Sequence, residues 1–599
     1  MLSDQKTDVL VIGTGGSGMM AATRAAQLGG DVIIADKSPS FGGTTALSGG
    51  CLWIPQNHLQ TDDIKDSKNL SLSYLKNLTK GEVSQKILET YVENAQKMLL
   101  YLEKIGGISL SLCPEYCDYY PEISGGIKGR TVEPDAFDGE LLGKDRQYLK
   151  NPQKMTLMFG QISLTAKEAH TLIAGGKTGR ILALKKVLGY FLLFFLRNKR
   201  GRDRRLTLGQ GLVAGMWKMM KNQGVKPMLG TAVVKLLTQD GRVCGALMQS
   251  DKGFFRLWTK KGVIMACGGF SRNESLKQKY YSKLSKAEWG AAVEQDQGDA
   301  LKFCPELAPK LGLMSQAWWM PVMRVPNEDY ARSVVVDRSM PGSFVVDQKG
   351  HRFVNESAPY EDFVMAMRED ASRSPCWLVT DSFHRKNYSL GPLLPGSHFP
   401  DWTVKKGLIG EFVLVADSME ELAEKIKVPK ENLLETQKVF NRFAKEGKDP
   451  MFQRGLSEYD RYYADKRVTP NPCLRALLEG PFYAAKLYPG DFGSKGGFVV
   501  DENAQVLNER NEPIEGLYAA GNAAANPLGN TYPGAGGTLG PGLTFGYIAG
   551  EAILKGNLQI KNNKAPSHKD LKAPSHKNDQ VFLGPRRKKS ENKLPPSLE

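Results

Sequence analysis

The chain has 599 residues, which is too long for one hydrophobic core, and 41% of them are hydrophobic, as in a folded, soluble protein. Its eight cysteines include no CxxC pair, which excludes a disulfide framework, and no metal site is predicted. The net charge of +16 lies almost wholly in residues 177–205 (+9) and 561–599 (+6), so the remainder of the chain is close to neutral.

The N-terminal segment predicts a dinucleotide-binding unit. A short apolar strand over residues 8–13 is followed by Gly13, Gly15 and Gly18 in GxGxxG spacing, a helix, and a second strand that ends at Asp36. The glycines let a pyrophosphate approach the helix N-terminus, and Asp36 is placed for a ribose hydroxyl. No signal-peptide segment precedes the first strand, which predicts a cytoplasmic protein.

The next stretches continue this first domain. Residues 41–50, FGGTTALSGG, combine glycines and hydroxyls in a way that suits a backbone wrapped closely around a cofactor. A small antiparallel meander that returns into a parallel sheet is expected further along. The elements predicted here are helices over 60–106 and 206–223, strands at 230–237, 243–250, 254–259 and 262–269, and a helix that opens at Gln297–Asp299.

The middle of the chain has a different pattern, because short strands alternate there with helices. This pattern predicts an inserted α+β domain. The fold expected is α/β: a Rossmann-type FAD-binding domain (residues 1–315 and 482–556), an inserted α+β capping domain (316–481) and a disordered basic tail (557–599). The tail contains the repeat KAPSHK, and its His568 and His576 are interpreted as solvated residues rather than metal ligands. The inserted domain is expected to contain strands at 343–347 and 376–380 and helices at 419–427 and 430–446. Strands at 496–500 and 516–521 are expected to return the chain to the first domain.

Residues 516–550 contain the densest set of chemical signals in the chain. A strand, a Gly-Asn turn and a Gly-rich loop lead to a helix start, and Tyr532 lies four residues before Gly536. A phenol and a bare backbone amide beside a helix N-terminus can bind a carbonyl oxygen and stabilise the negative charge that develops on it.

These motifs, with the Ala-Cys-Gly-Gly turn at 266–269, together resemble the FAD-dependent fumarate reductase/succinate dehydrogenase flavoprotein superfamily over residues 5–555. The chain departs from the fumarate reductases where they bind a dicarboxylate. Their HTMGG-like segment is Gly493-Ser-Lys-Gly-Gly497 here, and Tyr360 stands where they have a proton-donating arginine. The departures point to the 3-ketosteroid Δ1-dehydrogenase branch. Four segments resemble that branch: DYY at 118–120, NESAPY at 355–360, YPGAG at 532–536 and SGGCLWIP at 48–55.

The resemblance implies desaturation of the A ring of a 3-ketosteroid between carbons 1 and 2. Tyr360 would take the carbon-2 proton with the assistance of Tyr119, while Tyr532 and the Gly536 N–H polarise the 3-keto oxygen. Tyr120 stays open as the residue that faces the site in place of Tyr119. FAD would take the carbon-1 hydride, and no histidine in GGTTALSGG offers a covalent link, so the FAD is expected to be noncovalent.

The FAD-binding residues that the resemblance implies lie in every part of the first domain. They are Gly13, Gly15, Gly16, Ser17, Gly18, Asp36, Lys37, Gly42, Gly43, Thr44, Thr45, Ser48, Gly49, Gly50, Val233, Ala266, Gly268, Gly298, Asp299, Gly521, Asn522, Gly537, Gly540 and Leu543. Trp318, Trp319, Met320 and Phe363 are expected near the site, either as an apolar substrate cleft or as packing core.

Residues 171–206 form a basic, hydrophobic insertion. Its apolar run at 187–196 is too short to span a membrane, and it is flanked by Lys185, Lys186 and the Arg197–Arg205 cluster. This pattern favours an interfacial helix on an anionic membrane at the inner face, although a core helix with a charged end is an alternative. The expected partners are a 3-ketosteroid and a quinone-like electron acceptor, and nucleic acid is not expected.

Three other functions stay open at this point. One is a 3-ketosteroid Δ4-(5α)-dehydrogenase, which would share the carbonyl-binding groups but place its base differently. Another is a reductase of the same superfamily that acts on a different enone. The third is a membrane-surface flavoprotein that transfers electrons or binds sterols without this chemistry.

Overall fold

A mixed sheet of eight strands carries the nucleotide-binding loop. The computed structural model describes residues 2–555 apart from 175, 193, 195–197, 200, 201 and 282–284. The strand order is β12-β2-β1-β15-β14-β13, with β25 paired to β15 and β24 paired to β25. The strands are β1 (Gln5–Ile12), β2 (Val32–Asp36), β12 (Lys226–Leu229), β13 (Ala232–Gln239), β14 (Arg242–Ser250), β15 (Gly253–Met265), β24 (Gln505–Leu507) and β25 (Pro513–Ala519).

The strand β15 joins the meander to the parallel part of this sheet. It pairs antiparallel with β14 and parallel with both β1 and β25. The stretches 254–259 and 262–269, expected as two strands, therefore form one long strand that ends at Met265. Val9, Leu10 and Val11 of β1 are fully buried, as expected for a strand covered on both faces.

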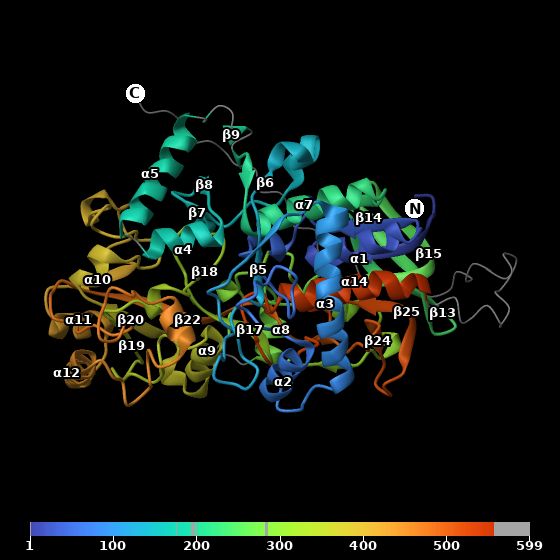
Figure 1. Ribbon diagram of the computed structural model, residues 1–599. Helices are drawn as coiled ribbons and strands as arrows, with labels where there is room; N and C mark the ends of the chain where they lie inside the picture. The colour runs from blue at the N-terminus through green and yellow to red at the C-terminus, as the bar shows by residue number, and fades with distance from the viewer. Residues whose placement is uncertain are drawn as a thin grey trace, which may run out of the picture. The chain divides into compact units, whose positions relative to one another are not determined.

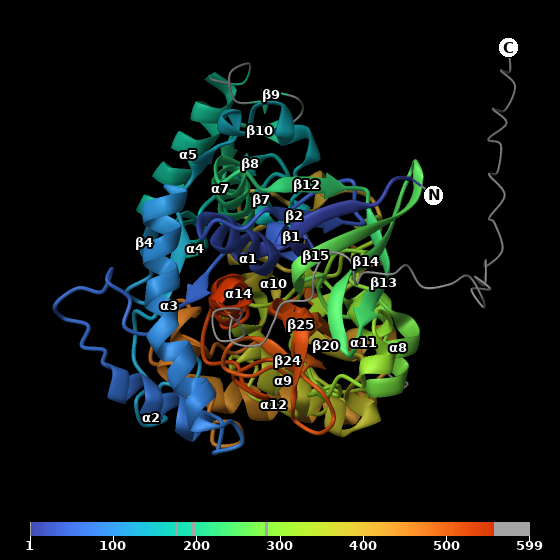
Figure 2. The same ribbon diagram turned by 90° about the vertical axis from the view of Figure 1, so that its right-hand side faces the viewer.

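Glycines bring two helices close together behind the nucleotide-binding loop. The helix α1 (Gly16–Gln27) packs against α14 (Leu539–Lys555), and α3 (Gln85–Gly106) lies alongside α14 (Figure 2). A Cβ atom at Gly546 would lie 2.5 Å from the Ser17 carbonyl oxygen, and one at Gly550 would lie 2.4 Å from that of Ala21. Only glycine permits this approach of the two backbones.

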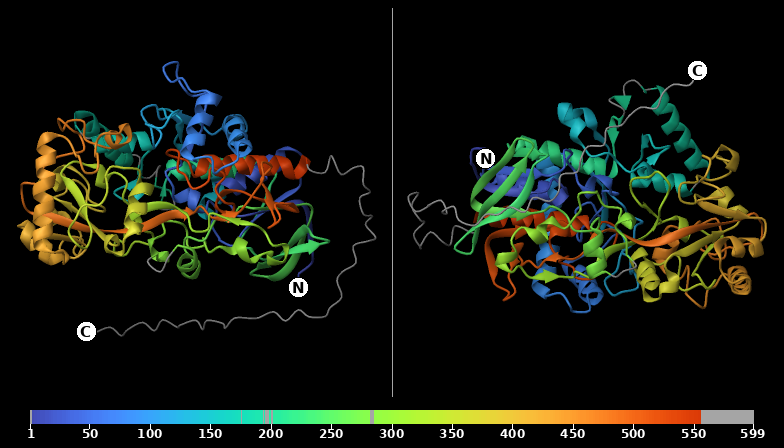
Figure 3. Two further views of the ribbon diagram at one scale, coloured as in Figure 1. Left: turned by 90° about the horizontal axis from the view of Figure 1, so that it is seen from below. Right: turned by 180° about the vertical axis from the view of Figure 1, so that it is seen from behind.

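The predicted α+β region forms a second sheet of six strands. Its order is β18-β17-β22-β20-β19, with β21 also paired to β22. Figures 1 and 3 show the helices of this region beside it, away from α1 and α14. The elements are β17 (Ala317–Met323), β18 (Arg332–Ser333), β19 (Ser343–Val346), α9 (Tyr360–Glu369), β20 (Cys376–Thr380), α10 (Ser382–Asn387), β21 (Val413–Ala416), α11 (Met419–Ile426), α12 (Lys430–Glu446) and β22 (Phe482–Ser494).

The strand β22 shifts the expected return of the chain to the first sheet. Residues 482–494 pair with β17, β20 and β21, so they belong to the second sheet and not to the first. The return to the first sheet therefore begins after Ser494. The sequence pattern of β22 alone does not reveal which of the two sheets this strand joins. The division of the chain into domains stays a prediction.

The other predicted elements are largely confirmed. The helical pattern over 60–106 forms α2 (Lys68–Leu78) and α3, and 206–223 forms α7 (Leu208–Asn222). A small sheet holds β3 (Leu52–Trp53), β4 (Leu110–Leu112) and β5 (Thr131–Pro134). Two expectations were too long: the helix at Gln297–Asp299 is only a short 3-10 turn, Asp299–Lys302, and the strand at 496–500 is only β23, Gly497–Phe498.

The basic insertion begins in the last turn of α4 (Ala166–Ala174) and includes the helix α5 (Gly176–Leu192). In the described part of the chain, no helix has both the length and the apolar character needed to cross a membrane. The tail 557–599, with its KAPSHK repeat, His568 and His576, lies outside the described residues, as do Leu196 and Arg197.

Candidate active site

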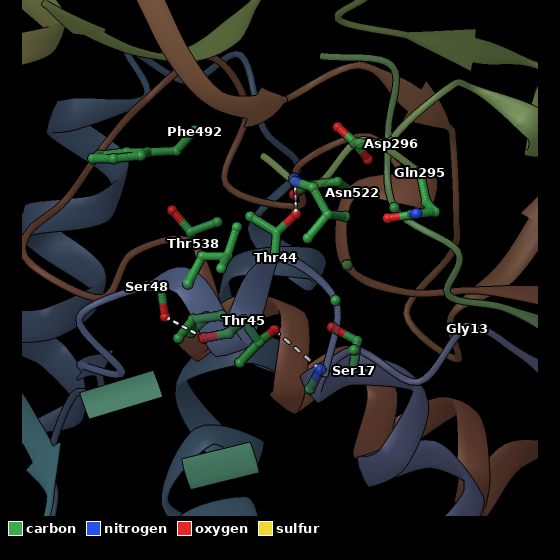
Figure 4. A pocket seen from close by; sticks show the side chains of 18 of the residues that line it. Gly13, Ser17, Thr44, Thr45, Ser48, Gln295, Asp296, Phe492, Asn522 and Thr538 are labelled. Carbon is green, nitrogen blue, oxygen red and sulfur yellow. Dashed lines mark hydrogen bonds between the residues drawn. The ribbon is translucent and has the colours of Figure 1, made fainter. Parts of the chain in front are cut away.

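A cavity of about 740 Å³ opens between the nucleotide-binding loop and residues of the second sheet. Figure 4 shows Ser17, Thr44, Thr45, Ser48 and Asn522 around it, with Gln295 and Asp296 on another side. All four predicted catalytic residues and most predicted cofactor residues line it. These are Gly13, Gly15, Gly16, Ser17, Asp36, Lys37, Gly43, Thr44, Thr45, Ser48, Gly49, Gly50, Tyr119, Val233, Ala266, Gly268, Asp299, Tyr360, Gly521, Asn522, Tyr532 and Gly536.

Six predicted cofactor residues do not line the cavity: Gly18, Gly42, Gly298, Gly537, Gly540 and Leu543. Several of them serve packing around it instead. A Cβ at Gly18 would lie 2.0 Å from the Gly13 carbonyl oxygen, and one at Gly540 would lie 2.4 Å from that of Trp53. The glycine pattern alone does not separate a residue that faces the ligand from one that lets two backbones approach.

The nucleotide end of the cavity fits an extended dinucleotide. Gly13 has φ of 105° and leads into the N-terminus of α1, whose free N–H groups favour a pyrophosphate. A Cβ at Gly15 would have no neighbour nearer than 3.9 Å, and one at Gly49 would have none within 4 Å, so both backbones leave room for a bound group. The Gly16 N–H donates to Thr45 Oγ1 at 3.1 Å, which joins this loop to the 41–50 segment.

The ribose-binding candidate Asp36 is held firmly in place. Its Oδ2 accepts from the N–H of Thr14 at 2.8 Å and from Thr14 Oγ1 at 2.6 Å, and its Oδ1 accepts from the Ser38 N–H. Lys37 forms an ion pair with Asp299 across the cavity rim. Sequence reasoning did not identify Thr14, although it lies inside the GxGxxG motif.

Two tyrosines meet at the opposite end of the cavity. Tyr119 Oη and Tyr360 Oη lie 2.6 Å apart, and both side chains are buried. Tyr120 instead donates to Asp362 Oδ1 at 3.0 Å, so Tyr119 is the residue of the DYY segment that faces the cavity. Tyr360 begins α9, which fixes its ring at the start of a rigid element.

The pKa values of the two phenols are raised well above their ordinary range by burial. Both are therefore neutral near pH 7. A phenol that is to accept a proton needs a hydrogen bond that favours its charged form, and the partner hydroxyl at 2.6 Å can supply it.

Tyr532 and Gly536 form a cradle for an oxygen atom next to this pair. The ring of Tyr532 lies 5.2 Å from that of Tyr360 and 5.1 Å from that of Tyr119. Thr538 Oγ1 donates to Tyr532 Oη at 3.1 Å, which leaves the phenol proton of Tyr532 free to donate to a ligand. Burial raises the pKa of Tyr532 to about 12, so it stays protonated, as an oxyanion donor must.

The backbone conformation at Gly536 requires glycine. Its φ is 90°, and a Cβ there would lie 2.5 Å from the backbone of Leu52 and Trp53. Among the described residues, the Gly536 N–H finds no hydrogen-bond acceptor. An unsatisfied N–H that lines a cavity is suited to an anionic oxygen.

A buried network holds the 532–536 loop in position. Tyr74 Oη donates to the Pro533 carbonyl at 2.7 Å, and the Tyr119 N–H donates to the same oxygen at 3.1 Å. Below the loop, Trp53 Nε1 donates to Asp118 Oδ1 at 2.7 Å, and Arg130 pairs with Asp118 at 2.5 Å. Burial raises the pKa of Asp118 to about 6 against the opposing charge of Arg130. This network fixes the segment that carries Tyr119 and the 532–536 loop relative to each other.

A buried ion pair lies behind the tyrosines and was missed by sequence reasoning. Lys495, in the segment that replaces HTMGG, pairs with Glu361, which follows Tyr360 on α9. Lys495 Nζ lies 5.0 Å above the Trp318 ring, and that ring packs edge-on against Tyr532 at 4.9 Å. The sequence does not indicate this ion pair, because the two residues lie 134 positions apart in the chain.

The walls beside the tyrosines are apolar and aromatic. Met320, Val335 and Phe492 line the cavity, and so do Tyr116 and Tyr463, whose hydroxyls contact each other. Of the other predicted cleft residues, Trp318 touches the site, whereas Trp319 and Phe363 belong to the packing core of the second sheet. The arrangement can hold an apolar ketone, polarise its oxygen and remove an adjacent proton.

Comparison with known proteins gives matches that cover most of the chain. Residues 8–539 match the family model described as FAD binding domain. A 3-oxosteroid 1-dehydrogenase of Mycolicibacterium smegmatis is 36% identical over 92% of this chain and 97% of its own. A 4-oxocyclohexanecarboxylate 2-dehydrogenase of Sinomonas cyclohexanicum is 30% identical over 91% and 92%.

A solved structure matches equally well. The crystal structure of a 3-ketosteroid delta1-dehydrogenase from Sterolibacterium denitrificans, in complex with 1,4-androstadiene-3,17-dione, superposes with a TM-score of 0.89. Its sequence is 38% identical, and the match covers 92% of this chain and all of that one.

Proposed function

This chain belongs to the 3-oxosteroid 1-dehydrogenase family of FAD-dependent oxidoreductases, and we propose that it desaturates the A ring of 3-ketosteroids between carbons 1 and 2. The observation that carries this proposal is the Tyr119–Tyr360 pair at 2.6 Å beside the cradle of Tyr532 and Gly536. A base and an oxyanion site within one buried cavity are the two groups that removal of a proton alpha to a ketone requires.

Each residue has a defined role in this proposal. The Tyr532 hydroxyl and the Gly536 N–H donate to the 3-keto oxygen and stabilise the enolate-like charge. Tyr360 accepts the carbon-2 proton, and Tyr119 stabilises the charge on the Tyr360 oxygen by hydrogen bonding. Bound FAD supplies the acceptor for the carbon-1 hydride. The substrate thus loses a proton and a hydride and gains a double bond.

The cofactor-binding roles follow the cavity lining. The N-terminus of α1 would hold the pyrophosphate, Asp36 the ribose, and the 43–50 segment the remainder of the FAD. No histidine lines the described cavity, which supports noncovalent FAD. We further infer a quinone-like acceptor that removes the electrons after each turnover, and a cytoplasmic location.

A small cyclic keto acid is the second candidate substrate, because a relative at 30% identity is named for one. The charges of the cavity favour the steroid. Of its cationic lining residues in the described chain, Lys37 and Lys150 are paired with Asp299 and Glu294, and Lys302 lies with Lys37 at the nucleotide end. A carboxylate next to the tyrosines would therefore lack a partner.

We expect the purified protein to have a kcat/KM for androstenedione that exceeds that for 4-oxocyclohexanecarboxylate by at least about hundredfold, because the rings beyond ring A add apolar contact. Steady-state turnover with an artificial acceptor measures both values. Equal values, or a preference for the keto acid, would contradict the steroid assignment. Product analysis separates the Δ1 from the Δ4-(5α) reaction.

The insertion supports a further proposal: the helix α5 lies on the anionic surface of the inner face of the membrane. Ile181, Leu184, Leu188, Phe191 and Leu192 project from α5 and are 45–81% exposed. Their spacing places most of them on one face of the helix, and this exposure argues against the alternative of a core helix.

Replacing both Leu184 and Leu188 by Ser should lower the partition of the protein onto anionic liposomes about tenfold or more, because two apolar side chains no longer enter the interface. Co-sedimentation measures the partition, and retained turnover reports folding. Leu456→Ser is the matched control, since Leu456 is 69% exposed and lies outside the insertion. If the double variant and the control sediment like the wild type, α5 is not the anchor.

A further inference from the structure

The segment that follows α10 carries the most exposed large apolar side chain of the described part of the chain. Trp402 lies in a short 3-10 turn, Asp401–Thr403, and is 86% exposed. Leu394, earlier in the same segment, is also exposed. We call residues 394–406 the Trp402 loop. An indole combines a large apolar body with one polar N–H, so it suits a surface that is apolar on one side and wet on the other.

A buried arginine holds the Trp402 loop in a defined shape. Arg385 of α10 is only 3% exposed, and its guanidinium donates to the carbonyl of Leu394 at 2.6 Å and to that of Phe399 at 3.0 Å. It also pairs with Asp401 at 2.7 Å. Because the loop is anchored at three points by one side chain, Trp402 is presented to the outside by a built structure.

A short hairpin (residues 157–163) connects this loop to α5. Phe159 at the hairpin turn is half exposed, and its ring packs edge-on against that of Phe399, with the ring centres 5.5 Å apart. Two residues further on, Gln161 Oε1 accepts from Tyr190 Oη of α5 at 3.2 Å. Figure 1 shows α5 and α10 at the same end of the molecule. The exposed residues of α5, Phe159 and the Trp402 loop are therefore linked by direct contacts.

The charges of the Trp402 loop suit an anionic lipid surface. Lys405 and Lys406 follow the tryptophan closely, and both are exposed. Asp401 is the only acidic residue of the loop in the sequence, and it is paired with the buried Arg385. An indole at headgroup level beside lysines that reach the lipid phosphates is typical of proteins that lie on a membrane surface.

We propose that the Trp402 loop is a second contact with the lipid surface, with the indole of Trp402 at headgroup level and Lys405 and Lys406 at the lipid phosphates. This inference rests on the proposed membrane contact of α5. A single interfacial helix leaves the protein free to rotate about the helix axis. Two contacts from segments far apart in the chain fix the orientation of the protein on the surface.

The test uses Trp402 as its own reporter. The FAD-loaded protein is mixed with vesicles of phosphatidylcholine and phosphatidylglycerol whose acyl chains are brominated near the headgroup, because bromine quenches a tryptophan that it contacts. We expect lower tryptophan emission than with unbrominated vesicles. Trp402→Phe should remove most of this loss of emission while turnover is retained. The matched control is Trp258→Phe, which should keep the loss, since Trp258 is half-buried on β15 and donates to Asp4.

A second variant measures the contribution of the loop to binding. Trp402→Ser should lower the partition of the protein onto the unbrominated anionic vesicles about tenfold, because its large apolar side chain no longer enters the interface. Equal quenching in Trp402→Phe and Trp258→Phe would overturn the assignment. So would self-association that is lost in Trp402→Ser and is not accompanied by quenching, since a second copy of the chain would then cover the loop.

The α5 variant with Leu184 and Leu188 replaced by Ser separates the two membrane proposals. If Trp402 is not quenched but the α5 variant still loses its partition onto vesicles, the Trp402 loop is not a contact and the proposal for α5 stands. If the wild type does not partition onto anionic vesicles at all, both membrane proposals fail. Steroid turnover in solution is measured independently of either result.

Discussion

Replacement of Tyr360 by Phe is expected to lower turnover of androstenedione by about 10²–10⁴-fold while the protein keeps its FAD. The substitution removes the phenol oxygen that accepts the carbon-2 proton in the proposed reaction, but the ring still packs against Tyr119 and Tyr532. We do not expect Tyr119 to replace it, because in the proposed reaction Tyr119 stabilises the charge on the Tyr360 oxygen and does not itself take the proton. Turnover with an artificial acceptor, with flavin content measured alongside, checks the expectation.

Tyr120→Phe is the control for this variant. Tyr120 is the neighbour of Tyr119, and its hydroxyl donates to Asp362 rather than into the cavity. We expect at most a small change in turnover for it. A Tyr360→Phe enzyme as active as the Tyr120→Phe enzyme would remove Tyr360 as the base.

Tyr532→Phe is expected to lower kcat by about 10²–10³-fold, the effect typical of losing one oxyanion donor. Tyr532 is protonated at neutral pH because burial raises its pKa to about 12, and Thr538 occupies its oxygen from the other side. The loss should fall mainly on kcat rather than on KM, since the hydrogen bond to the ketone strengthens as negative charge develops.

The control for Tyr532 is Tyr488→Phe. Tyr488 belongs to the edge of the same aromatic cluster and stacks on Trp289 at 5.0 Å, outside the lining of the cavity. It tests whether loss of any tyrosine hydroxyl near the site disturbs the enzyme. A kcat for Tyr532→Phe equal to that of Tyr488→Phe would show that Tyr532 does not stabilise charge on the substrate.

The sequence predicted the parts of the site that are encoded by short motifs. The GxGxxG turn, the 41–50 segment and Tyr532-Pro-Gly-Ala-Gly536 all reach one cavity. Such motifs can be recognised within a short stretch of sequence, because a tight turn or a helix start needs glycine at a fixed spacing. The strand–helix order of the first sheet was predictable for the same reason.

The parts that escaped prediction depend on contacts between distant segments. Whether Tyr119 or Tyr120 faces the cavity is decided by the loop that Asp118 and Arg130 anchor, not by the DYY motif itself. The Lys495–Glu361 pair joins two elements far apart in the chain.

The same limit applies to the predicted cofactor residues that do not line the cavity. Gly18, Gly42, Gly298, Gly537 and Gly540 match motif positions, but they do not line the cavity, and Gly18 and Gly540 make close backbone contacts instead. Likewise β22 has an ordinary strand pattern, and only its pairing with β17 and β20 places it in the second sheet.

The most direct test of the account is anaerobic mixing of the purified, FAD-loaded protein with androstenedione while the visible absorbance of the flavin is followed. Without an acceptor, one turnover of the proposed reaction would move a hydride to the bound flavin and a proton to Tyr360, and would leave the steroid with a new double bond. We predict loss of the flavin absorbance together with formation of the 1,4-diene in an equal amount. Unchanged flavin absorbance with FAD bound, and with other 3-ketosteroids also inert, would contradict the proposed reaction.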